Sequence, residues 1–379
     1  MTNVLYRESP EPQIFESPPT EPRAFHAALD GYAPTALLEL PALARRWGVG
    51  RVLMKMETDR LGLPSFKVLG ASWATVEALR PLLPADWTPR DGLRALVGRL
   101  PVRTLVTATD GNHGRALARL ARILELPSRI YAPTNISPRR RAAIAAEGAE
   151  IVEVDGSYDD AVARSAQDAE DEASVLVSDT SWPGYEAVPA AVIDGYSTIL
   201  WEIEDQLSAS ASQRPDLVFV QLGVGSFGAA VIRHFQRRSD QAPRLVGVEP
   251  ESAACVMASL AADAIVSVPG PHDSVMAGLN CGTPSLVAWP LLREGLDAVV
   301  AIDDEPVLDA VRLLAGDGLD VGECSAAAVA AAGELLCGPR AAEHRARLEV
   351  AQDATVLLFA TEGVTDQDAF ARAVGRPER

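Results

Sequence analysis

The sequence predicts an α/β protein in which two open, twisted, mainly parallel sheets, each flanked by helices, face one another across a ligand cleft. Three observations indicate this fold. From residue 104 onward, short apolar segments alternate with amphipathic helical segments. The alternation forms two series, which are separated by a break and crossover at 183–195. Two glycine-bearing turns each follow a predicted strand, at the end where open α/β sheets bind their ligands.

The predicted elements follow in order along the chain. Residues 1 to about 24 are polar and rich in Pro and Glu, which indicates a loose arm. A helix is expected at 36–47, a strand at 51–57, and a helix from the Lys67 turn to about residue 80, before a loop or short helix at 86–101. The first series has strands at 104–108, 129–132, 150–154 and 175–178 and helices at 114–124, 138–147 and 158–172; the second has strands at 217–221, 245–249, 298–302 and 355–359 and helices at about 228–238, 253–262, 305–315 and 326–336.

Composition excludes several classes of protein. A chain of 379 residues suits two domains or one large one. The net charge of −18 disfavours nucleic acid and anionic membrane surfaces as partners. The first 22 residues lack the pattern of a signal peptide, and no segment has the length of a membrane helix. The four cysteines have no metal-site spacing, so we expect reduced thiols, no bound metal and a cytoplasmic location.

Lysine usage singles out one position. Only two of the 34 basic residues are lysines, Lys55 and Lys67, and all the others are Arg. Only an amine can lose its proton near neutral pH and condense with an aldehyde. Lys67 follows a Gly/Pro turn and begins a predicted helix, where the helix dipole would lower the pKa of its amine. Lys67 is therefore either a Schiff-base lysine or a solvated lysine at a helix start, whereas Lys55 is expected to be structural or to form a salt bridge.

The segment T-A-T-D-G-N-H-G at 107–114 follows a predicted strand and opens a helix. Gly111 and Gly114 allow a tight turn, and the amides of a helix start can bind a carboxylate or phosphate. Asp110, Asn112 and His113 place ionisable and polar groups at the carboxyl end of that strand. The alternative is a turn that only caps the helix, but the mixture of glycine and ionisable groups here favours a site.

The second turn is made of Gly223, Val224, Gly225, Ser226, Phe227 and Gly228, between a strand and a helix. This arrangement can hold a phosphate with backbone amides. A G-x-G-x-x-G pattern also suits a dinucleotide, whose ribose needs an acidic residue about 20 residues further on. Glu249 lies close to that spacing, so the pattern leaves both ligands open.

Three later segments lie beside predicted element ends: A-G-L-N-C-G at 277–282, G-E-C-S-A at 322–326 and T-E-G-V-T-D at 361–366. Each is compatible with simple turn chemistry, except that Thr361 directly follows a buried strand, where its hydroxyl can meet a ring nitrogen at the cleft floor. An imine-forming lysine, an amide-rich phosphate loop, an Asn-bearing turn and this hydroxyl together indicate pyridoxal phosphate.

These motifs together resemble the fold-type II pyridoxal-phosphate enzymes, whose fold is similar to that of the tryptophan synthase β subunit. Among them the chain is most similar to the diaminopropionate ammonia-lyase family, over about residues 24 to 370. The resembling stretches are F-H-A-A-L-D-G-Y-A-P-T, D-R-L-G-L-P-S-F-K-V-L-G-A-S-W-A, T-A-T-D-G-N-H-G-R, S-D-T-S-W followed by Gly184 and Tyr185, the 223–228 loop, M-A-G-L-N-C-G and T-E-G-V-T-D. The resemblance implies a large cofactor-binding domain of residues 1–78 and 190–379, a small domain of residues 79–189, an active site between them, and a homodimer.

The resemblance also assigns roles to residues. It implies that Lys67 holds the cofactor, Asn112 contacts the ring oxygen, the 223–228 loop holds the phosphate, and Thr361 faces the pyridine nitrogen. Asp110 stands where the hydroxy-amino-acid dehydratases carry Ser, and it and Asp179 would take part in proton transfer. Two departures bear on the substrate: the segment 323–326 reads Glu-Cys-Ser-Ala where the pattern is Glu-Ser-Gly-Ala, and the phosphate loop carries Phe227.

The implied reaction is α,β-elimination of ammonia from 2,3-diaminopropionate or a similar β-substituted amino acid, giving aminoacrylate and then pyruvate and ammonia. Lys67 or Asp110 would remove the Cα proton, according to the chirality of the substrate. Three alternatives remain open from the sequence: a serine/threonine dehydratase or β-replacement enzyme with the same cofactor, an NAD-dependent dehydrogenase, and a non-catalytic ligand-binding homologue.

Overall fold

The computed structural model describes residues 3–7, 14–109, 111–134, 136–171, 173–210, 214–237 and 242–376. Its described strands form two sheets. The larger has the order β1 (Asn3–Tyr6), β10 (Ala298–Ile302), β9 (Arg244–Pro250), β8 (Leu217–Gln221), β11 (Thr355–Ala360), β3 (Arg51–Met56) and β2 (Leu37–Glu39). The smaller has the order β6 (Glu150–Val154), β5 (Ser128–Pro133), β4 (Thr104–Ala108) and β7 (Ser174–Leu176). All neighbours pair in parallel except the two edge strands β1 and β2, which run antiparallel to β10 and β3. The predicted α/β fold with two mainly parallel sheets is confirmed.

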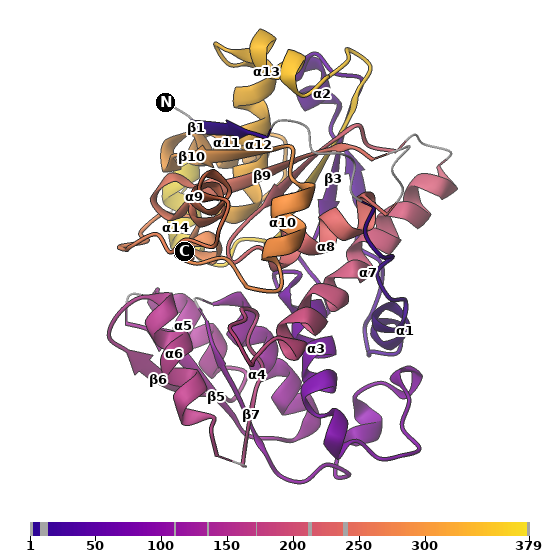
Figure 1. Ribbon diagram of the computed structural model, residues 1–379, viewed down its shortest axis with the longest axis vertical. Coiled ribbons are helices and arrows are strands. Elements are labelled where there is room, and N and C mark those ends of the chain that lie inside the picture. The colour runs from indigo at the N-terminus through magenta and orange to yellow at the C-terminus, as the bar shows by residue number, and fades with distance from the viewer. Residues whose placement is uncertain are drawn as a thin grey trace.

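Helices cover both sheets, and Figure 1 shows the larger sheet in the upper part of the molecule and the smaller one below. The helices are α1 (Glu21–Ala27), α2 (Pro41–Trp47), α3 (Lys67–Ala78), α4 (Asn112–Leu124), α5 (Pro138–Ala145), α6 (Tyr158–Asp168), α7 (Ala187–Ala209), α8 (Ser226–Phe235), α9 (Cys255–Ala262), α10 (Trp289–Gly295), α11 (Asp304–Gly316), α12 (Glu323–Cys337), α13 (Ala341–Arg347) and α14 (Gln367–Val374). Because helices lie on both faces, β8, β10 and β11 are buried along their whole length.

The strands of the smaller sheet all lie between residues 104 and 176, and those of the larger sheet lie before residue 57 or after residue 216. The division of the chain into domains at 78/79 and 189/190 stays a prediction. Figure 1 shows α3 and α7 between the two layers, and these helices pack against each other.

Three sequence expectations were wrong. The supposed break at 183–195 is instead largely the start of α7, a helix of 23 residues. Gly195 lies at the closest approach of α7 to α3, because a Cβ there would come within 2.5 Å of the Leu69 carbonyl oxygen. The glycine therefore marks a helix crossing, and an isolated sequence cannot distinguish that from a chain break.

The other two errors concern the first 47 residues. The expected helix at 36–47 is strand β2 followed by α2, since Pro41 starts the helix late and the preceding residues pair with β3. The supposed loose arm contributes edge strand β1, which pairs with β10, and the start of α1. The polar composition of the arm predicted no regular structure, but backbone pairing with the distant strand β10 orders part of it. Residues 1–2 and 8–13 of the arm lie outside the described residues.

Candidate active site

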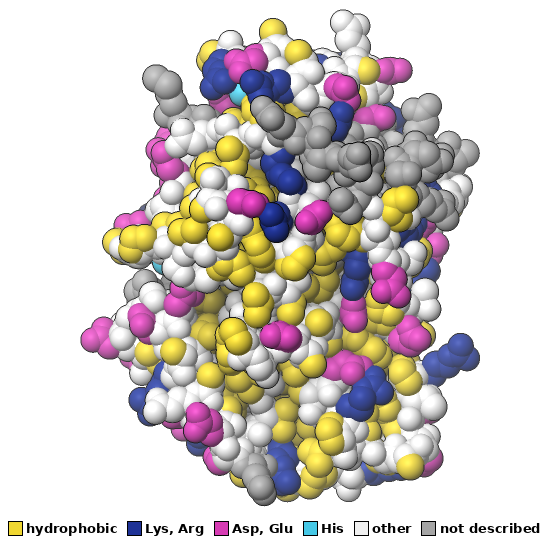
Figure 2. Space-filling view, viewed as in Figure 1, with side chains coloured by type: hydrophobic (Ala, Val, Ile, Leu, Met, Phe, Trp, Pro, Cys, Tyr) yellow, Lys and Arg dark blue, Asp and Glu magenta, His cyan; other side chains and the backbone are white. Residues whose placement is uncertain are grey.

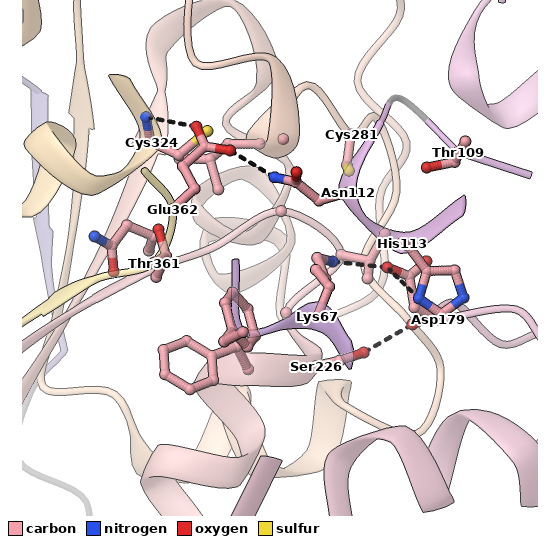
Figure 3. A pocket seen from close by; sticks show the side chains of 18 of the residues that line it. Lys67, Thr109, Asn112, His113, Asp179, Ser226, Cys281, Cys324, Thr361 and Glu362 are labelled. Atoms are coloured by element: carbon pink, nitrogen blue, oxygen red, sulfur yellow. Dashed lines mark hydrogen bonds and ion pairs between the residues drawn. The ribbon is translucent and has the colours of Figure 1, made fainter. Parts of the chain in front are cut away.

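A pocket of about 700 Å³ lies where the carboxyl ends of β4, β8 and β11 come together, the position at which parallel sheets bind ligands. Its walls come from both sheets, so it lies in a cleft between them. Figure 3 shows several of its side chains. The lining residues are Phe66, Lys67, Ala108, Thr109, Asn112, His113, Tyr158, Asp179, Gln221, Gly223, Val224, Gly225, Ser226, Phe227, Gly278, Leu279, Cys281, Cys324, Thr361 and Glu362.

Lys67 is the first residue of α3, as predicted, and reaches this pocket. Its turn is held against the segment that follows β11. Ser65 forms an antiparallel bridge with Glu362, and the Gly363 amide donates to the Pro64 carbonyl at 2.8 Å. Two motifs that are almost 300 residues apart in the sequence thereby form one wall of the site.

The Lys67 Nζ donates a hydrogen bond of 2.7 Å to Asp179 Oδ2 (Figure 3). Asp179 is 5% exposed and also accepts from Tyr158 Oη at 2.8 Å, while His113 Nδ1 lies 4.0 Å from Oδ2. Burial alone would raise the pKa of Asp179, but the charge of Lys67 and the hydrogen bonds from Lys67 and Tyr158 hold this pKa well below its usual range. Asp179 is therefore an anion held ready beside an amine.

His113 is buried, and burial lowers the pKa of its imidazole. Its Nε2 bonds to the Val177 carbonyl at 2.8 Å, so this nitrogen carries the proton. Its Nδ1 lies 4.0 Å from Asp179 Oδ2 and has no hydrogen-bond partner among the described residues. In its neutral state His113 therefore adds no charge beside the carboxylate.

The 223–228 segment follows β8 and opens α8, as predicted: its glycine turn ends at Gly225, and α8 begins at Ser226. Gly225 has φ +95°, and a Cβ there would lie 2.4 Å from Leu292 Cδ1, so the turn requires glycine. The amides of Ser226 and Phe227 begin α8 and have no intrahelical acceptor, which suits a bound anion. The Phe227 ring packs on Phe66 with centroids 4.5 Å apart, so this departure from the family pattern anchors the loop next to the Lys67 turn.

Glu249, the residue at about the dinucleotide spacing, does not line the pocket. Its carboxyl accepts from the amides of Val256 and Met257 at 2.8 Å and so caps α9. Burial raises the pKa of Glu249 to about 8. It has no access to a ribose in this pocket, which removes the sequence argument for a dinucleotide.

At the start of α4, Thr109 Oγ1 accepts from the amides of Gly111 and Gly114, both at 2.9 Å. The alternative prediction for the 107–114 segment was a turn that only caps the helix, and Thr109 provides those capping interactions. Asn112 lines the pocket, and its Nδ2 donates to Glu362 Oε2 at 2.6 Å (Figure 3). Asp110 lies outside the described residues, and its role stays a prediction.

Thr361 shows that the pocket fits pyridoxal phosphate. Its side chain is 5% exposed, and its Oγ1 is buried with no hydrogen-bond partner among the described residues. A buried hydroxyl without a partner costs about 1–3 kcal/mol, and a ring nitrogen in the pocket would satisfy it. The Thr361 hydroxyl, the Lys67 amine and the anion-binding loop together match the ring nitrogen, the aldehyde and the phosphate of the cofactor.

Sequence reasoning missed two residues of this site. Glu362 follows Thr361 at the end of a buried strand, so the signal that identified Thr361 could also have identified Glu362. For Tyr158 the chain carries only a helix-start signal, the capping box of Ser157 and Asp160. Its contact with Asp179 depends on the tertiary fold.

Comparison with known proteins defines the class. The family described as "Pyridoxal-phosphate dependent enzyme" matches residues 28–362, and this chain belongs to that family. Its cofactor is pyridoxal 5'-phosphate.

Within the family, the chain is similar to proteins named diaminopropionate ammonia-lyase. That of Salmonella typhimurium is 34% identical over 92% of this chain and 89% of its own length, and that of Escherichia coli K12 is 32% identical over 98% and 95%. The crystal structure of the Escherichia coli enzyme in complex with D-serine has a TM-score of 0.89 and 29% identity, covering 99% of this chain and 97% of that one. Maize serine racemase, at 20% identity and a TM-score of 0.72, shows the shared fold alone.

The described residues offer neither a metal site nor a membrane-spanning helix. No group of three or more His, Cys, Asp or Glu side chains in the described ranges is arranged to hold a metal ion. Within the same part of the chain, no helix has the length and apolar character needed to cross a membrane.

Proposed function

We propose that this protein eliminates ammonia from 2,3-diaminopropionate, giving aminoacrylate that hydrolyses to pyruvate and a second ammonia. The observation that carries the proposal is the Lys67–Asp179 pair at 2.7 Å on the pocket wall, in a chain whose relatives over nearly its whole length are diaminopropionate ammonia-lyases. An amine base beside a carboxylate suits a reaction that removes one proton and releases an amine.

The residues present suggest how the cofactor would be held. Lys67 would bind its aldehyde carbon, the amides of the 223–228 loop its phosphate, Asn112 its ring oxygen and Thr361 its ring nitrogen. When bound, pyridoxal phosphate withdraws electrons from the substrate Cα and makes its proton acidic. A hydroxyl at the ring nitrogen cannot hold that nitrogen charged as a carboxylate would, which favours elimination at Cβ over transamination.

Side chains of the protein carry out the proton transfers. The Lys67 amine, once neutral, can accept the Cα proton on its own face, and we propose Asp110 as the base for the opposite face. Loss of the Lys67 charge also removes the largest influence that lowers the pKa of Asp179. Asp179 then becomes a better proton carrier, and Tyr158 keeps it in position. The leaving β-amino group must depart protonated, and Asp110 and Asp179 are the carboxyl groups proposed to hold it as a cation.

Turnover of a substrate panel tests the proposal. Purified protein with pyridoxal phosphate should release pyruvate and ammonia from 2,3-diaminopropionate, and faster than from serine, threonine or β-chloroalanine. Both isomers should be tested, since the base depends on the face of Cα. Turnover of serine or threonine with none of diaminopropionate would instead establish a dehydratase.

We infer that the chain forms a homodimer in the cytoplasm. Supporting this, a band of apolar side chains crosses the face shown in Figure 2, with charged side chains scattered among them, and none of the four cysteines is in a disulfide. Light scattering after gel filtration should give twice the 40.2 kDa chain mass. A mass that stays at one chain across dilution would contradict the dimer.

A further inference from the structure

A second, larger cavity of about 1360 Å³ lies beside the cofactor pocket and shares Tyr158 with it. Its walls are the start of α5 and of α6 on one side, and the segment 271–280 with the starts of α12 and α14 on the other. Gly156, Pro271 and Asp273 in its lining are exposed, so the cavity opens to solvent and forms the mouth of the cleft. The lining residues are Pro133, Ile136, Ser137, Arg140, Gly156, Ser157, Tyr158, Pro271, His272, Asp273, Ser274, Val275, Ala277, Asn280, Glu323, Asp366 and Ala369.

Glu323 is a buried acid in this cavity that forms no ion pair with a described residue. It is 7% exposed, and its carboxyl accepts a hydrogen bond from its own backbone amide but forms no hydrogen bond or ion pair with another described residue. Burial, reinforced by the negative charge of Glu362, raises the pKa of Glu323 to about 7. Other buried glutamates of the described chain, such as Glu147 and Glu202, contact arginines instead. A carboxyl that is buried without compensation is costly unless a ligand supplies the missing charge.

Asn280 provides a second unused acceptor in the same cavity. Its Nδ2 donates to the Ser274 carbonyl at 2.8 Å, which fixes the amide, and its Oδ1 is buried with no hydrogen-bond partner among the described residues. Gly278 packs against the first turn of α12, since a Cβ on it would lie 3.3 Å from Cys324 Sγ. That contact brings the segment of Asn280 alongside the helix start that carries Glu323.

The charges around Glu323 come from several elements. The charge of Arg140 on α5 lowers the pKa of Glu323, and Arg140 Nη2 donates to Thr365 Oγ1 at 3.2 Å. Asp366 at the start of α14 and Glu362 after β11 raise that pKa, and His272 and Asp273 also line the cavity. The acids around Glu323 outnumber the cations, so the charges of this cavity favour a positive ligand.

We propose that Glu323 and Asn280 form a binding subsite for primary ammonium groups at the mouth of the cleft, outside the cofactor pocket. An ammonium has three donors and no acceptor, so it matches a carboxylate with a neighbouring amide oxygen. The subsite rests on the proposed function for its natural ligand: 2,3-diaminopropionate carries a second ammonium group that serine, threonine and β-chloroalanine lack. It favours capture of the cationic amino acid before the chemical step.

Kinetics of the holoenzyme at low ionic strength test the subsite. Glu323→Gln should lower kcat/KM for 2,3-diaminopropionate about tenfold, the usual scale for one charge-assisted hydrogen bond. kcat should change less than threefold, and kcat/KM for β-chloroalanine should stay within twofold. Asn280→Ala, on a different element, should also lower kcat/KM for 2,3-diaminopropionate relative to kcat/KM for β-chloroalanine. Asp273→Asn removes the same charge from an exposed position in the same cavity and is the matched control. It should change kcat/KM for 2,3-diaminopropionate and for β-chloroalanine by no more than twofold.

Two arms separate failure of the subsite from failure of the proposed function. If the wild-type protein turns over diaminopropionate and Glu323→Gln keeps its kcat/KM, the subsite is wrong and the proposed function stands. If the wild type does not turn over diaminopropionate, calorimetric titration of both holoproteins with ethane-1,2-diammonium chloride decides the matter. Weaker binding to Glu323→Gln supports an ammonium subsite in an enzyme with another substrate, and equal binding refutes it.

Discussion

The two lysines of this chain occupy opposite kinds of surroundings. Lys55 is fully buried in a network with Glu57, Arg60 and Glu202, and its Nζ contacts Glu202 Oε2 at 2.7 Å. Burial lowers the pKa of Lys55, an effect that the two glutamates partly offset. The side chain of Lys67 is 21% exposed, begins a helix and reaches a pocket in which it pairs with Asp179.

The difference lies in what each region leaves unsatisfied. The network around Lys55 pairs two cations with two anions, and Thr35 and Tyr32 add further hydrogen bonds. The cleft around Lys67 instead contains polar atoms that bond to nothing in the described chain, among them Thr361 Oγ1, Gln221 Oε1 and Asn280 Oδ1. A satisfied network specifies the fold, whereas unsatisfied groups in a cleft indicate positions for ligands.

The largest expected effect comes from exchanging the reactive lysine. Lys67→Arg keeps the charge beside Asp179 but removes the only amine in the pocket, so turnover should fall by roughly a thousandfold or more. Borohydride reduction of the wild-type holoenzyme followed by peptide mass mapping should place the cofactor on Lys67. A modified Lys55 would reverse the comparison between the two lysines.

Removing the structural lysine should lower the stability of the protein but leave its catalytic activity largely unchanged. Lys55→Met leaves part of a buried carboxylate charge uncompensated, so the free energy of unfolding should fall by about 3–5 kcal/mol in urea denaturation. Turnover per folded molecule should change little. Arg51→Met is the control on the same strand, because it breaks the more exposed pair with Glu39 and should cost less than about 1 kcal/mol. Equal losses would mean that the buried network contributes nothing special.

The unpaired carboxyl of Glu323 should make stability depend on pH. Its folded-state pKa of about 7 lies above the ordinary value of 4.5, so its contribution is complete below pH 4.5 and is lost as pH rises through 7. From this group alone, the free energy of unfolding should decrease by about 3 kcal/mol between pH 4.5 and pH 8. Glu323→Gln should remove that part of the slope, which chemical denaturation of both proteins at the two pH values measures. Parallel curves would show that Glu323 is solvated or paired.

The smallest expected effect concerns Thr361. Thr361→Val keeps the shape and removes the unpartnered hydroxyl, so the protein without cofactor should be as stable as the wild type or slightly more so. Affinity for pyridoxal phosphate should fall about tenfold, which corresponds to one hydrogen bond of roughly 1.4 kcal/mol. Fluorescence titration of the protein with the cofactor measures the change. A loss of stability with unchanged affinity would assign the hydroxyl to the fold.

The sequence by itself determined the strand–helix alternation, the position of Lys67 at a helix start and the glycine loop before α8. These features are local, since hydrophobic periodicity and glycine turns depend on residues close in the chain. The positions of Asn112 and Thr361 at the carboxyl ends of predicted strands identified them directly, and the motif resemblance added Asp179; all three line the same pocket. The role of Asp110 and the domain boundaries stay predictions.

Only the tertiary structure decided which separated groups meet. Residues far apart in the chain meet in three places: Ser65 pairs with Glu362, Tyr158 contacts Asp179, and Lys55 forms a buried ion pair with Glu202. The same holds for α7, whose Gly195 lies in a helix crossing, and for Glu323, whose isolation is visible only once its neighbours are placed. Local patterns carry no information about which buried polar atoms find a partner, because partners come from other elements and burial depends on the whole fold.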